Sequence, residues 1–297
     1  MSEIQLQEPP VAVAADADIE FHRLARRWAL GRRWRLIAGV LLAIVIYAVL
    51  IVAVFLIGYL ALGADFERVF GAEDYADPLT YLLAYGTVAL MLPAVLLSFW
   101  IVGCRPIGLL SSVAGRLRWA WVARLWPAAL VIWAVTLAAS LLSDPAALPR
   151  VATVNGWLLL AALAVTPFQA AAEEYVFRGA LAQTVGAWLK NPWWAILLPV
   201  PLFVVGHGYD WVGLTGVTLF AVAAGWLTYR SGGLEAAIVM HVVNNTSLGA
   251  LAAFGLVDLN AVSFDPVLLV VDVAPIAVFV GWVEWLLWRQ RRAAVRG

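Results

Sequence analysis

The sequence predicts an all-α fold, a polytopic membrane helical bundle of about eight transmembrane helices with both termini on the cytoplasmic side. Composition is the first observation, because 64% of the residues are hydrophobic and only 13% are charged. A soluble domain is about half apolar and a quarter charged, so this chain carries apolar surface that only lipid can cover. The second observation is a series of long apolar runs, and the third is the one-sided placement of the basic residues between them.

The apolar runs define the expected spans in order. A helix needs about 20 apolar residues to cross about 30 Å of hydrocarbon. We expect spans at 36–62, 79–103, 119–142, 156–180, 193–208, 213–231, 233–253 and 267–288. The runs are too long for barrel strands and lack period-two alternation, so helices are predicted. The fifth is short, and Pro192, Pro199 and Pro201 in and beside it predict a kink.

The basic residues predict the orientation of these spans. With the spans alternating in direction, 16 of the 19 basic residues lie on one side of the membrane. Acidic residues such as Asp65, Glu73 and Asp258 lie in the opposite loops. Because loops rich in Lys and Arg stay in the cytoplasm, both termini are expected inside, in the plasma (inner) membrane of a bacterial cell. The polar start of the chain, residues 1–20, reads as a disordered tail rather than a cleaved signal peptide.

Ionisable residues inside apolar runs are costly, and they are therefore candidates for function. Glu173, Glu174 and Arg178 lie near the end of the fourth expected span. On a helix Glu174 and Arg178 stand at i and i+4, the favourable order for an ion pair, while Glu173 is rotated by about 100° toward a different neighbour. One carboxylate would then be held ionised by the arginine, and the other would be free to accept a proton from water. A solvated helix end with a snorkelling arginine is the structural alternative.

Two histidines and an amide form the remaining candidates. His207 lies between two glycines, which permit close backbone approach, and His241 precedes Asn245 by one helical turn. His241 and Asn245 can both donate hydrogen bonds to a developing oxyanion. Polar contacts that only hold helices together are the alternative for each motif taken alone. The sequence has neither a His-Glu-x-x-His nor a Gly-x-Ser-x-Gly motif, and its single cysteine, Cys104, is expected to be a small filler residue at a helix end.

At these three clusters the sequence resembles the CPBP family, the CAAX protease and bacteriocin-processing (Abi) intramembrane endopeptidases. That family shows Glu-Glu-x-x-x-Arg, then Phe-x-x-x-His, then His-x-x-x-Asn or Asp. This chain matches the three motifs in order, with Glu173, Glu174 and Arg178, then Phe203 and His207, then His241 and Asn245. The resemblance covers about residues 155–255 and includes the turn from Arg230 to Leu234.

The resemblance implies a membrane endopeptidase acting on a hydrophobic or lipid-modified peptide. Glu173 and His207 would activate water, His241 and Asn245 would stabilise the oxyanion, and Glu174 with Arg178 would hold the site together. It also leaves open a zinc site formed by Glu173, His207 and His241, whereas a glutamate mechanism requires no cofactor. Membrane lipid is an expected partner and nucleic acid is not.

On this interpretation the chain divides into four parts. These are a cytoplasmic basic tail (1–35), N-terminal transmembrane helices (36–150), a CPBP-like catalytic core (151–255), and the last transmembrane helix with a basic cytoplasmic tail (256–297). Two other functions remain as alternatives. One is a non-catalytic scaffold or immunity protein of the same fold, and the other is a proton-coupled transporter that uses the same acids and histidines as a relay.

Overall fold

A computed structural model describes residues 20–63, 74–143, 153–266 and 268–296. Within these ranges the chain is helical, and its only strand-like pairing is an isolated bridge between Ser112 and Gly233. The all-α prediction is therefore confirmed. The helices are α1 (Ala25–Ala29), α2 (Trp34–Leu62), α4 (Pro78–Ala89), α5 (Met91–Ile101), α6 (Trp119–Ser143), α8 (Gly156–Glu174), α9 (Ala182–Trp188), α10 (Pro192–Leu197), α11 (Val200–Val204), α12 (Trp211–Ser231), α13 (Glu235–Ala253) and α14 (Leu268–Arg296). Short 3-10 helices η1 (Phe21–Arg23) and η2 (Ile107–Leu110) and a π-helical segment η4 (Tyr175–Leu181) complete the described part.

Six helical segments in the described ranges are long and apolar enough to cross a membrane, so the protein is an integral membrane protein. They correspond to the first, second, third, fourth, sixth and seventh expected spans. The fifth is shorter than expected, because prolines divide Pro192–Val204 into α10 and α11. Its 13 residues reach about 20 Å at 1.5 Å per residue, less than the hydrocarbon thickness of about 30 Å. The eighth expected span corresponds to α14.

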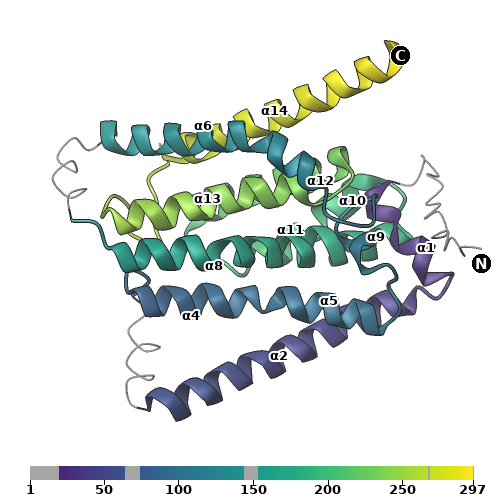
Figure 1. The fold of residues 1–297 in the computed structure, drawn as a ribbon, viewed down its shortest axis with the longest axis horizontal. Coiled ribbons are helices and arrows are strands. Elements are labelled where there is room, and N and C mark those ends of the chain that lie inside the picture. The colour runs from purple at the N-terminus through teal and green to yellow at the C-terminus, as the bar shows by residue number, and fades with distance from the viewer. Residues whose placement is uncertain (1–19, 64–73, 144–152, 267, 297) are drawn as a thin grey trace, which may run out of the picture.

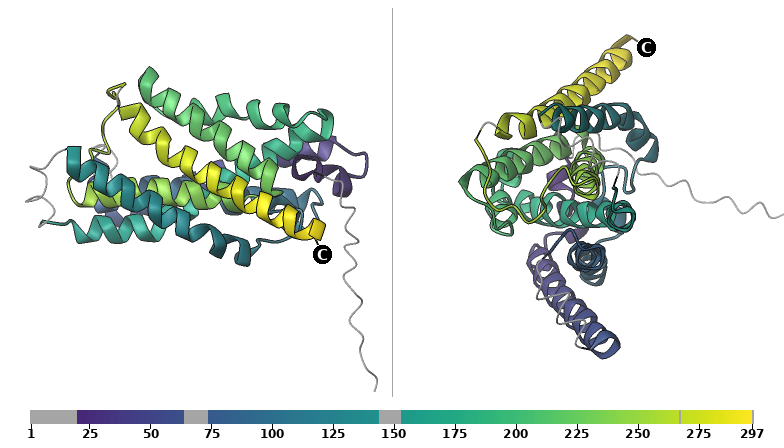
Figure 2. Two further views of the ribbon diagram at one scale, coloured as in Figure 1. Left: turned by 90° about the horizontal axis from the view of Figure 1, so that it is seen from above. Right: turned by 90° about the vertical axis from the view of Figure 1, so that its left-hand side faces the viewer.

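The bundle is built around two central helices, α8 and α13 (Figure 1). Helix α8 packs between α4 and α13, and α13 also packs against α6 and α12. Helices α2 and α14 lie at opposite edges of the bundle, as Figure 1 and the right-hand view of Figure 2 show. Of the candidate spans, α13 is the most buried, whereas the apolar window of α2 contains no buried residue. Polar residues on α8 and α13 are therefore shielded from lipid by the surrounding helices.

The turn between α12 and α13 fixes the start of the most buried helix. Gly232 ends α12 in a left-handed conformation, with φ of 71°, which a side chain would disfavour. At Gly233 a Cβ would lie 2.6 Å from the Cβ of Ser112, so the loop before α6 leaves no room for a side chain. Arg118 in that loop binds Glu235 at the start of α13 through a 2.7 Å ion pair. The glycine turn thereby sets where His241 lies along the bundle.

The described part of the predicted N-terminal tail is folded. Residues 21–29 form η1 and α1 and pack against α9, with Phe21, Leu24 and Trp28 buried. His22 is also buried, and its Nε2 lies 3.2 Å from the Lys190 carbonyl oxygen. Burial lowers the pKa of His22, since the charged imidazolium would be poorly solvated there. The expected disordered tail, 1–20, lies almost entirely outside the described residues.

Candidate functional site

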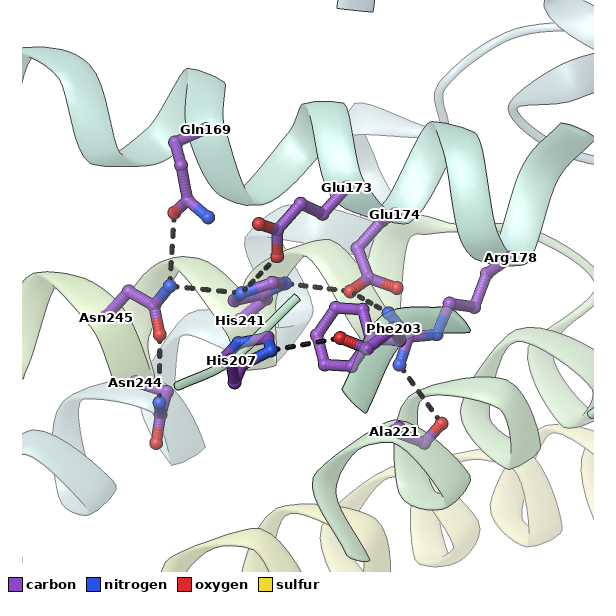
Figure 3. A network of polar contacts seen from close by, with 10 residues as sticks. All are labelled: Gln169, Glu173, Glu174, Arg178, Phe203, His207, Ala221, His241, Asn244 and Asn245. Carbon is purple, nitrogen blue, oxygen red and sulfur yellow. Dashed lines mark hydrogen bonds and ion pairs between the residues drawn. The ribbon is translucent and has the colours of Figure 1, made fainter. Parts of the chain in front are cut away.

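The predicted site residues lie on elements that meet inside the bundle (Figure 3). Glu173 and Glu174 lie at the end of helix α8, and Arg178 lies in segment η4. His241 and Asn245 lie on helix α13, and His207 lies in the loop after α11. Helices α8 and α13 pack along each other, so their polar stretches face one another. Five of the six are joined by direct polar contacts, and His207 approaches them through an aromatic ring.

Glu174 and Arg178 form the expected ion pair in a fully buried setting. The Nη1 of Arg178 donates to Oε1 of Glu174 at 2.9 Å, and the two side chains are 5% and 0% exposed. The Nη2 of Arg178 donates to the carbonyl oxygen of Ala221 on α12 at 3.2 Å. Its guanidinium also lies over the ring of Phe203, 4.4 Å from the centroid. Arg178 therefore links α11 and α12 to the end of α8 through its side-chain contacts.

His241 lies between the two carboxylates. Its Nδ1 is 2.8 Å from Oε1 of Glu174, and its Nε2 is 3.5 Å from Oε2 of Glu173. We expected Glu173 to face a different neighbour from Glu174, and the structure shows both facing one ring. The 100° offset between adjacent helical positions allows this, because an imidazole presents two nitrogens on opposite edges. Since a carboxylate only accepts, the proton on Nδ1 of His241 donates to Glu174.

The two glutamates differ in accessibility. The side chain of Glu174 is 0% exposed, whereas that of Glu173 is 14% exposed. Glu173 is thus the carboxylate that a water molecule or a substrate can reach, and Glu174 is the one committed to internal partners.

Asn245 continues the chain of contacts on the other side of His241. Its Nδ2 lies 3.1 Å from Nε2 of His241 and donates at 3.1 Å to Oε1 of Gln169. Its Oδ1 accepts from Asn244 at 3.0 Å, so the amide is oriented by three neighbours. Sequence reasoning missed Gln169, which is buried on α8 one turn before Glu173. A second polar residue on the same face, four positions before the acid pair, was the available signal.

His207 is placed by the end of α11. Its Nδ1 bonds the carbonyl oxygen of Phe203 at 3.0 Å, and because a carbonyl only accepts, Nδ1 carries the proton. The Nε2 of His207 then carries a lone pair, and this nitrogen has no hydrogen-bond partner among the described residues. The ring of His207 lies 5.0 Å from that of Phe203, whose own ring lies 6.2 Å from that of His241. Among the described residues, no hydrogen bond joins His207 to Glu173 or Glu174.

The residues suggested for zinc do not form a metal-binding group in this geometry. The described ranges contain no set of three His, Cys, Asp or Glu side chains arranged to hold a metal ion. At His241 both ring nitrogens already have partners, and at His207 one nitrogen is committed to a carbonyl oxygen. A ligand set of Glu173, His207 and His241 would require these bonds to be exchanged, so the side chains as placed do not fit a bound zinc ion.

Other polar residues in the apolar runs have structural partners. Glu284 on α14 binds Arg230 through two 2.6 Å hydrogen bonds and accepts from the indole of Trp226 at 3.0 Å. The side chain of Asp272 lies outside the described residues. Cys104 is buried, and burial raises the pKa of its thiol to about 12, which suits the expected filler role.

Fold and site together define a helical integral membrane protein with an acid–histidine–amide site enclosed between its central helices. Residues 155–247 match the family described as type II CAAX prenyl endopeptidase Rce1-like, and this match supports membership of the CAAX protease family. The matched segment contains all the predicted site residues. A curated relative from Bacillus subtilis (strain 168), named uncharacterized protein YyaK, is 37% identical over 100 residues. That alignment covers 31% of this chain and about a third of the relative's length. No solved structure shows significant similarity to the chain.

Proposed function

We propose that the protein is an intramembrane endopeptidase in which Glu173 and His207 activate water and Asn245 and His241 stabilise the oxyanion. One observation carries the proposal, a continuous line of polar contacts from Gln169 through Asn245, His241 and Glu174 to Arg178, enclosed in an apolar bundle. Burying so many polar groups is costly, and contacts between helices alone do not require an acid pair around one histidine.

Glu173 is the proposed general base because it is the accessible carboxylate and is not neutralised by a direct arginine contact. A water between Glu173 and the free Nε2 of His207 would donate to both groups. When the water oxygen bonds to the substrate carbonyl carbon, one water proton passes to Glu173. The same proton is then delivered to the amide nitrogen as the carbon–nitrogen bond breaks, which leaves a carboxylic acid and an amine.

Asn245 and His241 are the proposed oxyanion donors. In the resting structure Nδ2 of Asn245 uses one hydrogen for Gln169 and directs the other at Nε2 of His241. A developing oxyanion would take that second hydrogen bond, while the bond to Gln169 keeps the amide in place. His241 would stabilise the same charge by donating from Nε2, the ring nitrogen that faces Glu173 and Asn245.

We infer the substrate class from the location of the site. The site lies between apolar helices, so a peptide that is hydrophobic or held at the membrane by a lipid would reach it most readily. Both termini are proposed to face the cytoplasm, from the basic residues at the start of α2 and the end of α14. The plasma membrane is the proposed location.

The test is cleavage of a fluorogenic library of lipid-modified and hydrophobic peptides by the detergent-purified protein. Wild type is compared with Glu173→Gln and His207→Ala, and each variant is first shown by thermal unfolding to be folded. Loss of a general base lowers turnover by about 10²- to 10⁴-fold, so both variants should be nearly inactive with an unchanged Tm. Arg105→Gln, an exposed arginine at the end of α5, is the control that should keep full activity.

A zinc chelator is included in a parallel reaction, and turnover should persist in its presence. Activity abolished by the chelator and restored by zinc would replace the glutamate mechanism with a metal-held water. Substantial cleavage by folded Glu173→Gln would remove Glu173 from the role of base. Absence of cleavage by folded wild type across the library would favour a non-catalytic scaffold of the same fold.

A further inference from the structure

A cavity of about 410 Å³ opens between the C-terminal parts of α12 and α14, away from the candidate active site. It is lined by Arg230, Glu284, Trp285, Trp288 and Arg291. None of these residues belongs to the line of contacts around His241. The cavity therefore needs its own explanation.

The charges in the cavity leave a positive excess. Arg230 donates through Nε and Nη2 to the two oxygens of Glu284, each at 2.6 Å, so this pair is neutral. Trp226 adds a third hydrogen bond to Glu284 and holds the carboxylate in place. Arg291 adds a second guanidinium to the lining, and the hydrogen bonds that Glu284 accepts in the described ranges come from Arg230 and Trp226. The cavity thus offers one uncompensated guanidinium beside a fixed Arg–Glu pair.

The tryptophans place the cavity at the level of a membrane interface. Trp285 and Trp288 are 41% and 48% exposed, and on the preceding turns of α14 the apolar residue Val278 is 57% exposed. Arg289 lies over the ring of Trp285 at 4.9 Å, and Arg292 lies over that of Trp288 at 3.9 Å. An exposed apolar face followed by tryptophans and then arginines is the order found where a helix leaves the hydrocarbon for the headgroup region.

We propose that this cavity binds the phosphate headgroup of an anionic glycerophospholipid. Arg291 would bind the phosphate oxygens through its planar fork of N–H donors, as guanidinium groups do with phosphate. The indole rings of Trp285 and Trp288 would flank the headgroup and glycerol, and the acyl chains would run along the exposed apolar face of α14. The positive excess favours phosphatidylglycerol over the zwitterionic phosphatidylcholine.

A bound lipid accounts for the site better than free phosphate does. The cavity is lined by the exposed Trp285 and Trp288, and the exposed Val278 lies two turns before Trp285 on the same face of α14. A free phosphate would leave this apolar surface uncovered. The ligand is therefore expected to contribute both a phosphodiester and acyl chains, and its source is the leaflet at the basic ends of α12 and α14.

The test measures binding of phosphatidylglycerol with a fluorescent acyl chain to the full chain in a neutral detergent, against the same label on phosphatidylcholine. Wild type should prefer phosphatidylglycerol, and Arg291→Gln should bind it about fivefold more weakly, the contribution of one arginine at a membrane surface. Arg291 is exposed, so the variant should fold, which its Tm checks. Arg105→Gln is the matched control, because Arg105 also lies over a tryptophan, Trp100, at 4.6 Å but lines no part of this cavity.

Three results would overturn the proposal. The first is equal binding of phosphatidylglycerol by wild type and Arg291→Gln. The second is an equal loss in Arg105→Gln, which would show diffuse attraction to a basic surface. The third is displacement of the labelled lipid by inorganic phosphate where sodium chloride of equal ionic strength has no effect, because the ligand would then be free phosphate. A fivefold loss confined to Arg291→Gln supports the headgroup site, whatever the outcome of the peptidase assay.

Discussion

Replacing Arg178 by methionine tests how the buried ion pair supports the site. Methionine keeps much of the side-chain length, so packing against Phe203 is largely retained while the charge and its donors are removed. Glu174 then keeps a single partner, Nδ1 of His241, and its Oε2 already has no hydrogen-bond partner among the described residues. The variant leaves a carboxylate in a setting where its side chain is 0% exposed.

Breaking a buried pair by removing one partner costs about 3 to 5 kcal/mol, and the remaining bond to His241 places Arg178→Met near the lower end of that range. Removing both charges is different, since replacing a whole buried pair by groups of similar volume is often neutral. The double variant Glu174→Gln with Arg178→Met should therefore recover most of the loss. A double variant that is more stable than one of its parent single variants cannot be explained by lost packing alone.

The assay is unfolding of the detergent-solubilised protein by heat and by denaturant, with the four proteins of the double-mutant cycle measured side by side. Arg230→Met is the matched control, because Arg230 and Glu284 are 24% and 30% exposed, so water can solvate the carboxylate that is left and the loss of stability should be smaller. The reasoning fails if Arg178→Met unfolds like wild type. It also fails if the double variant is less stable than Arg178→Met.

Three further predictions concern residues outside that pair. Gln169→Met should lower kcat about fivefold with KM little changed, because about 1 kcal/mol of orientation of Asn245 is lost; a change in KM alone would contradict a positioning role. Cys104, whose pKa burial raises to about 12, should resist maleimide at pH 7.5 until the protein is unfolded, and rapid labelling of folded protein would contradict its burial. Backbone N–H donors of Gly213, Phe264 and Val212 hold the pKa of Asp210 below its ordinary value. Its carboxylate therefore stabilises the fold at neutral pH, and this contribution is lost as the pH falls through the lowered pKa. Asp210→Ala should accordingly lower the Tm at pH 7, with a deficit that shrinks below about pH 4; a deficit of the same size at both pH values would exclude the charge as its source.

Much of the fold follows from apolar run length, and the departures have local causes. The run 79–103 is apolar throughout and predicts one helix, but the structure divides it at Leu90 into α4 and α5, shortly before Pro93. Proline likewise shortens the fifth span. The packing of residues 21–29 against α9 was not predictable, because a basic amphipathic segment and a polar tail have similar composition and only tertiary contacts distinguish them.

For the site, contacts within one helix were predictable and contacts between helices were not. Glu174 with Arg178, and His241 with Asn245, lie one turn apart and meet as helical geometry requires. The meeting of both glutamates on one imidazole, and the bond from Asn245 to Gln169, depend on how α8 and α13 are rotated about their axes. Periodicity does not specify that rotation, because both helices are apolar on most sides.

The π-helical segment η4 allows the continuous run of α8 and α9 to direct polar side chains at two different neighbours. A π turn holds an extra residue, so faces before and after it are offset by about 100° from those of a continuous α-helix. Before it, α8 directs Gln169 and Glu174 at α13; after it, α9 buries Gln183, whose Nε2 donates to the Leu109 carbonyl oxygen at 2.7 Å. In an uninterrupted α-helix Gln183 would be rotated by about 100° away from the Leu109 carbonyl oxygen. Arg178 lies within the π segment itself. The helical register of this segment therefore determines both how α9 packs and where the Arg178 guanidinium meets Glu174. The packing of α9 is thereby coupled to the geometry of the acid pair.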